Sequence, residues 1–285
     1  MDKLFKATVF NNEISLTVIS STDMVNEAIK IHSLTPSTAA ALGRTLTVCT
    51  FMSSGLKSQG DKLSVTVAGN GLGGKITVCG NGKLQMRGSI DNPSATLPLK
   101  ENGKLDVGGI VGNKGRITVV RSMGLKDPFS GTSELVSGEI AEDFASYYAL
   151  SEQVPTGIAL GVKIGTDGRC VGAGGVILQA LPFASEESLV KAEEIINNLS
   201  SLSSLIEEKG AEGVIKDFFG DIKTEEFYPE YKCLCSREYI EGVLVSLGKK
   251  EIDDILEKEN EIRVSCQFCL TEYVFTKEDT DKLFN

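Results

Sequence analysis

Residues 231–238 of this 285-residue chain read YKCLCSRE, so two thiols, Cys233 and Cys235, stand a single residue apart. A second pair, Cys266 and Cys269, follows in the stretch VSCQFCL, and 30 residues separate the two pairs. The complete pattern is C-x-C-x30-C-x-x-C. Two thiolate pairs separated by a loop match the four soft ligands that tetrahedral zinc takes at about 2.3 Å. The pattern therefore predicts a small C-terminal module folded around one Zn2+ per chain, with all four cysteines as metal ligands.

The same sequence contains no clear pattern of catalytic residues. No histidine lies near the four cysteines, so the ligand set closes without a position for catalytic water. The single histidine, His32, is expected on the apolar side of a helix, as a core or interface residue and not as a base. Residues 69–74 read GNGLGG, but a β-branched stretch follows where a dinucleotide site needs a helix, which predicts a hairpin turn. We expect that the chain is not an enzyme.

Three features favour a redox-sensitive zinc site over a purely structural one. The C-x-C spacing gives a less sheltered loop around the sulfurs than the usual C-x-x-C. Lys232 and Arg237 flank the first pair, and nearby cations favour the oxidisable thiolate. Each close pair can also form a disulfide with its own neighbour, and a C-x-C disulfide should be strained and readily reduced. The alternative is a zinc ribbon that binds nucleic acid or another protein and keeps its zinc permanently.

Zinc binding has large consequences for a module of this size. It contributes about 10–16 kcal/mol to the folding of small zinc modules, whereas whole domains are stable by only about 5–15 kcal/mol. Oxidation of the ligands should therefore unfold the chain from about residue 230 onward. The neighbouring segment should then lose its packing partner and expose apolar surface.

Charge divides the chain near residue 180. The net charge is −10, and residues 181–285 alone carry 24 acidic and 12 basic side chains. Such an acidic segment argues against nucleic-acid binding, which needs a basic surface. The N-terminus resembles a strand and not a signal peptide, and no apolar run approaches the roughly 18 residues of a membrane span. We expect a soluble, cytoplasmic protein without membrane contact.

The remaining cysteines, Cys49, Cys79 and Cys170, stand singly in apolar surroundings. Free cysteine is among the most buried residue types, so we interpret all three as small buried hydrophobic residues. The predicted zinc site does not need them.

Hydrophobic periodicity and turn residues predict an α+β fold. We expect a strand pair broken at Asn11-Asn12, a helix capped at residues 21–23, and a helix from Thr35-Pro36 to about Ser54. An antiparallel meander should occupy residues 62–120, followed by a helix from Glu139 to Ser151 capped by Ser137. Strands are expected at residues 157–162 and 171–181. Near the second cysteine pair, a knuckle should lead into a strand and then into a short helix capped by Thr276 and Asp279.

From Ser185 the sequence becomes helical, with apolar residues at helical spacing and glycines at 210, 213 and 220 that weaken the helix by roughly 1 kcal/mol each. The stripe comprises Leu189, Ala192, Ile195, Ile196, Leu199, Leu202, Leu205 and Ile206. This stripe can be covered in one state and exposed in another.

We predict three parts in the chain. An N-terminal α+β domain with an antiparallel-rich sheet occupies residues 1–180, a helical linker 181–230, and a zinc module 231–285.

The cysteine pattern with YKCLCSRE resembles the redox-regulated 33 kDa chaperonins, a bacterial heat-shock protein family, without departure at any cysteine. The resemblance extends over essentially the whole chain. The stretches LVSGEIAED at residues 135–143, SEQVP at 151–155 and GLKDPF at 124–129 also look like motifs of that family.

The resemblance implies an ATP-independent holdase that is inactive while reduced and zinc-loaded. Peroxide with heat, or hypochlorous acid, would convert the four thiolates into the disulfides Cys233–Cys235 and Cys266–Cys269. Zinc release would follow, the zinc module and linker would unfold, and homodimers would bind unfolding client proteins. The N-terminal domain would then serve substrate binding and dimerisation.

Overall fold

The structure, a computed structural model, describes residues 1–124 and 126–284. It divides into a first unit, Met1–Lys232, and a second unit that begins at Cys233. Residues 181–230, expected as a linker, lie within the first unit. Leu125, part of the predicted motif GLKDPF, lies outside the described residues. Among the described residues, no helix combines the length and the apolar character needed to cross a membrane.

Two sheets form the framework of the first unit. One has five strands in the order β10-β1-β2-β9-β8, and the other has six in the order β11-β5-β4-β3-β6-β7. All neighbouring strands are antiparallel except β11 and β5. The strands are β1 Leu4–Val9, β2 Ile14–Ser20, β3 Lys62–Ala68, β4 Ile76–Asn81, β5 Gln85–Ile90, β6 Arg116–Ser122, β7 Phe129–Glu134, β8 Thr156–Ile164, β9 Cys170–Ala180, β10 Glu225–Phe227 and β11 Glu230–Tyr231. The α+β class with antiparallel-rich sheets is thus confirmed.

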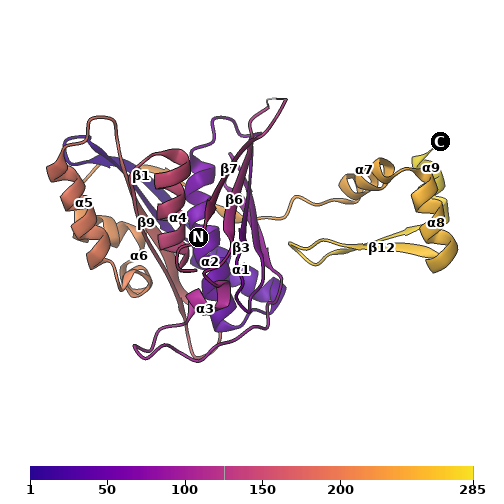
Figure 1. Ribbon diagram of the computed structural model, residues 1–285, viewed down its shortest axis with the longest axis horizontal. Coiled ribbons are helices and arrows are strands. Elements are labelled where there is room, and N and C mark those ends of the chain that lie inside the picture. Colours follow the sequence, from indigo (N-terminus) through magenta and orange to yellow (C-terminus); the bar gives the residue numbers. More distant parts are fainter. Residues whose placement is uncertain (125, 285) are drawn as a thin grey trace. The chain divides into compact units, whose positions relative to one another are not determined.

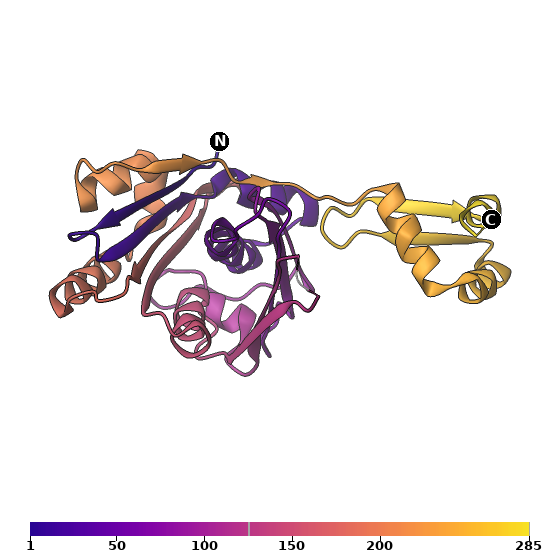
Figure 2. The same cartoon turned by 90° about the horizontal axis from the view of Figure 1, so that it is seen from above.

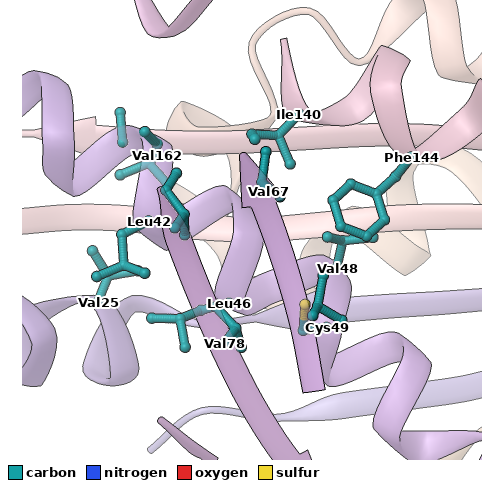
Figure 3. Packing of buried hydrophobic residues seen from close by; sticks show 14 of the residues in the cluster. Val25, Leu42, Leu46, Val48, Cys49, Val67, Val78, Ile140, Phe144 and Val162 are labelled. Carbon is teal, nitrogen blue, oxygen red and sulfur yellow. The ribbon is translucent and has the colours of Figure 1, made fainter. Parts of the chain in front are cut away.

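Helix α2 (Pro36–Ser54) lies between the two sheets and is buried along most of its length (Figure 2). It begins as predicted, because the Thr38 amide donates to the Thr35 hydroxyl and Pro36 occupies the first turn. Its apolar residues meet side chains from both sheets and from α4, as Figure 3 shows for Leu42, Leu46, Val48, Val78, Val162 and Phe144. This helix is the centre of the main core.

The preceding helix, α1 (Thr22–His32), is capped differently from the expectation. The Ser21 side chain makes no capping bond and instead lies 2.7 Å from the Thr47 hydroxyl. The Asp2 carboxylate accepts the amides of Asp23 at 3.0 Å and Met24 at 2.8 Å. A residue 20 positions upstream therefore satisfies the helix N-terminus, which local sequence patterns do not indicate.

The motif LVSGEIAED is organised by one buried carboxylate. Asp143 accepts main-chain N–H bonds from Val136, Ser137 and Gly138 through a single oxygen. The predicted cap was wrong, because Glu139 is the N-cap and the Ser137 hydroxyl accepts the Glu139 amide. The predicted helix is present as α4 (Ile140–Tyr147), followed by one π-helical turn, η1 (Tyr148–Glu152).

Four elements of the first unit were not predicted: α3 (Val107–Val111), β7, β10 and β11. Helix α3 has the sequence VGGIV and is held by the Asp106 side chain, which accepts the Gly109 amide at 2.9 Å. The loop at residues 69–74 packs against it, with the Gly71 amide donating to the Val111 carbonyl. That loop connects β3 to β4, so the predicted hairpin turn is confirmed.

Helices α5 (Glu186–Asn198) and α6 (Leu202–Phe219) cover the face of the five-stranded sheet opposite α2 (Figures 1 and 2). The predicted stripe mostly packs there, although Leu189 is exposed at 38%. Buried members are Ala192, Leu199, Leu202 and Ile206, with Ile195, Ile196 and Leu205 partly buried. Gly210, at φ 68°, breaks the helical backbone inside α6. Gly172 in β9 permits close packing, since a Cβ there would lie 2.2 Å from the Ser203 carbonyl oxygen.

The single cysteines largely follow the expectation. Cys49 and Cys170 are buried, whereas Cys79 is half-buried, with its sulfur 3.6 Å from the Ser64 hydroxyl. Burial raises the pKa of the Cys49 thiol and raises that of Cys170 to about 12, which keeps both protonated and unreactive. His32 is buried with its Nε2 3.0 Å from the Gly88 carbonyl oxygen, in agreement with a core role.

The second unit contains α7 (Arg237–Leu247), α8 (Lys249–Glu259), the hairpin β12 (Glu261–Ser265) and β13 (Glu272–Thr276), and α9 (Lys277–Leu283). Thr276 and Asp279 form the predicted capping box of α9. The unit has its own small core, whose buried members are Ile240, Leu244, Ile252, Leu256, Ile262 and Phe275.

Asp2 gives the first unit a defined pH dependence. Burial raises the pKa of the Asp2 carboxyl and the hydrogen bonds from two amides lower it; burial has the larger effect, so the pKa rises to about 6. The native state therefore binds a proton more tightly than the unfolded chain, so this group's stabilising contribution is lost as the pH rises from about 4 to 6. We expect Asp2→Asn to flatten that segment of the pH–stability curve, measured by urea unfolding with circular dichroism. An unchanged slope would show that another group controls it.

Candidate metal centre

The four cysteines of the pattern come from two loops of the second unit. Cys233 and Cys235 precede α7, whose first turn is capped by the Ser236 hydroxyl. Cys266 and Cys269 lie in the turn that joins β12 to β13. The turn is closed by the Cys266 amide, which donates to the Thr271 carbonyl at 3.0 Å, and by Leu270 in the left-handed region. This is the knuckle expected from the sequence.

The structure brings the four sulfur atoms together. All lie within 4.8 Å of one another. The Cys233 and Cys266 sulfurs are 3.6 Å apart, and the Cys235 and Cys269 sulfurs are 3.2 Å apart. Zinc–sulfur bonds of about 2.3 Å in a tetrahedron place the sulfurs about 3.8 Å apart. A closed set of four soft donors at nearly this spacing fits Zn2+.

Hydroxyl groups surround the sulfurs and influence their pKa values. Burial raises the pKa of Cys233 and, to a lesser extent, that of Cys235, whose thiolate is favoured by the Tyr273 hydroxyl at 3.2 Å. Burial also opposes ionisation of Cys269, but hydrogen bonding with Thr271 and with neighbouring thiols lowers its pKa to about 7. The sequence analysis missed both hydroxyls, although they stand two and four residues after Cys269.

The flanking cations do not have the expected partners. Arg237 stacks on the Phe275 ring, with its guanidinium carbon 4.3 Å from the ring centroid, and donates to the Val274 carbonyl at 3.0 Å. It also pairs with Asp279 in α9 at 3.2 Å. The Lys232 ammonium lies 3.5 Å from Glu230. Arg237 therefore connects α7 to β13 and α9, so its visible role is structural.

Known proteins of one family resemble this chain over nearly its whole length. The family profile described as "Hsp33 protein" matches residues 2–276. The chain belongs to the Hsp33 family. It is 40% identical to the 33 kDa chaperonin of Caldanaerobacter subterraneus subsp. tengcongensis, over 99% of this chain and 97% of that protein. It is 39% identical to the 33 kDa chaperonin of Bacillus pumilus, over 99% of this chain and 98% of that protein.

A solved structure extends the likeness to the fold. The crystal structure of the 33 kDa chaperonin (heat shock protein 33 homolog) from Thermotoga maritima superposes with a TM-score of 0.88 at 34% identity. The match covers 99% of this Hsp33-family chain and 97% of that one. The family assignment supports a chaperone role and confirms the resemblance recognised in the sequence.

Removal of one ligand tests the metal centre. We expect Cys266→Ser to lower the zinc content and to unfold the second unit, because zinc contributes about 10–16 kcal/mol to the folding of such modules. Zinc is measured by atomic emission and folding by amide hydrogen exchange. The matched control is Cys79→Ser, which removes a half-buried thiol of the first unit. A protected second unit without zinc would contradict the prediction.

Proposed function

We propose that this protein is a redox-regulated, ATP-independent holdase, inactive when reduced and zinc-bound. The observation that carries the proposal is the cluster of four sulfurs in a unit whose core, over residues 233–284, has six buried apolar side chains. Bound zinc would supply most of the folding free energy of that unit. Cys233, Cys235, Cys266 and Cys269 would be its ligands, one Zn2+ per chain.

Oxidation would remove those ligands. Two electrons leave each pair of zinc-bound thiolates as its sulfur–sulfur bond forms, and the oxidant takes them up with protons from water. Peroxide is thereby reduced to two water molecules, or hypochlorous acid to chloride and water. We propose the pairs Cys233–Cys235 and Cys266–Cys269. All four sulfurs are close enough to leave other pairings open, but local partners stay adjacent while the module unfolds. A disulfide no longer provides thiolates, so the zinc is released.

Unfolding of the zinc module would extend into residues 181–230. Gly210 already interrupts α6, and α5 and α6 hold the five-stranded sheet through the apolar stripe. Release of these helices would expose both the stripe and the sheet face beneath it, where Leu16, Val18, Val176 and Leu178 are buried. Such a surface would bind the apolar segments of unfolding proteins and prevent their aggregation.

The proposal includes further properties. The active form would be a homodimer in the cytoplasm, with residues 1–180 providing dimerisation and client binding, 181–230 the releasable linker and 231–285 the redox switch. It would act on unfolded or aggregation-prone proteins during oxidative stress and would bind neither nucleic acid nor membranes.

Activation should couple zinc loss to client protection. We expect peroxide at elevated temperature to release about one zinc per chain and, in parallel, to suppress light scattering by heat-denatured malate dehydrogenase. The variant with Cys49, Cys79 and Cys170 all replaced by serine or alanine should respond like the natural chain. Retained zinc would contradict the chaperone mechanism and favour a permanent structural zinc site. Zinc release without protection of the client would also contradict the mechanism.

The disulfide pairing can be read directly. Trypsin cleaves after Lys232, Arg237, Arg263 and Lys277, which places the two cysteine pairs on separate peptides, 233–237 and 264–277. Local pairing should yield each peptide alone, lighter by two hydrogen atoms in mass spectrometry. A disulfide-linked complex of the two peptides would show pairing across the loops, as for the sulfurs 3.2 Å apart in the reduced structure.

A further inference from the structure

Residues 225–232, here called the edge segment, complete both sheets of the first unit. Strand β10 pairs with β1 as the outermost strand of the five-stranded sheet, and β11 pairs with β5 as the outermost strand of the six-stranded sheet. Figure 2 shows the segment passing from one sheet to the other. Two edge strands, β1 and β5, are thereby covered by one short stretch of chain.

The edge segment is attached mainly through its backbone. The Glu230 amide donates to the Leu84 carbonyl at 3.1 Å, and the Lys232 amide donates to the Met86 carbonyl at 2.7 Å. On the other sheet, residues 225–227 stand in antiparallel register with Leu4–Lys6. The three residues of β10 are exposed, so burial of their side chains does not hold this strand. Main-chain pairing of this kind accepts almost any sequence.

One aromatic side chain and a few charges add specificity. Tyr231 packs against the main core, and its hydroxyl donates to the Gly88 carbonyl at 2.9 Å. The Lys3 ammonium of the neighbouring chain end pairs with Glu226 at 2.8 Å. The Gln85 amide donates to the Glu230 carboxylate at 2.9 Å. The edges thus hold an extended, acidic stretch with an aromatic residue that enters the core.

The segment also stands directly before the metal centre. Lys232, which bonds to Met86, is joined by one peptide bond to Cys233, the first sulfur ligand. When the second unit loses its fold, the chain beyond Lys232 no longer restrains the edge segment. Its departure leaves unpaired main-chain groups along β1 and β5, and such edges readily pair with another extended chain.

We propose that β1 and β5 are client-binding edges, and that residues 225–232 occupy them in the reduced protein as an internal stand-in for the client. The partner is an extended segment of an unfolded polypeptide, which adds a strand to either edge and places an aromatic side chain near Gly88. This inference rests on the proposed function and specifies how clients are held. It adds backbone recognition to the apolar contacts already described.

Photocrosslinking at the strand edges tests the inference. Benzoylphenylalanine replaces Lys6 in β1 or Gln85 in β5, and matched controls carry it at Thr156 in β8 or Thr132 in β7, the opposite edges of the same sheets. Oxidised protein is mixed with heat-denatured malate dehydrogenase and irradiated. We expect crosslinks at Lys6 and Gln85 at least about tenfold stronger than at the controls, and only after oxidation.

Amide hydrogen exchange gives a second readout on the unmodified chain. The amides of β1 and β5 that point toward the edge segment, among them that of Gly88, should lose protection on oxidation and regain it when the client is added. Suppressed aggregation with equal crosslinking at all four positions, or without renewed protection, would overturn the inference and leave the holdase intact. Failure to suppress aggregation would overturn the proposed function and the inference with it.

Discussion

The second unit depends on the convergence of four sulfur atoms within 4.8 Å of one another. Its six buried apolar side chains form a core that is small for residues 233–284. A hydrophobic core of that size contributes little stability, whereas zinc bound by four thiolates contributes as much as a whole domain normally has. In the proposed mechanism, the same sulfur atoms would bind the zinc that stabilises the unit and would react with oxidants, so its fold and its redox chemistry would share one set of ligands.

The first unit is built on a different principle. Helix α2 fills the space between two sheets, and its core does not require a metal. Helices α5 and α6 and the edge segment are additions to that core, one set on a sheet face and the other along two sheet edges. The two helices are attached through a modest apolar stripe, and the edge segment is attached through main-chain pairing. Gly210 interrupts the helical backbone of α6. In the proposed mechanism, these attached segments leave while the core around α2 stays folded.

Several sequence predictions describe the molecule well, because they depend on local chemistry. The helix start at Thr35-Pro36, the capping box at Thr276 and the hairpin turn at residues 69–74 are all encoded within a few residues. Other features depend on distant residues and were predicted wrongly or missed. The cap of α1 comes from Asp2, and Arg237 stacks on Phe275 and pairs with Asp279. Short α3, rich in glycine, exists because Asp106 and the core support it.

The sequence by itself identified the four cysteines that the structure brings together, since residue type and spacing suffice to recognise four thiolates that can share one ion. It also determined the α+β class and the apolar stripe, which follow from hydrophobic periodicity. Only the tertiary structure decided where the stripe packs, which hydroxyls face the sulfurs, and that residues 225–232 close two sheets at once. Strand pairing at an edge uses main-chain groups that every residue carries, so it leaves no signature in the order of side chains.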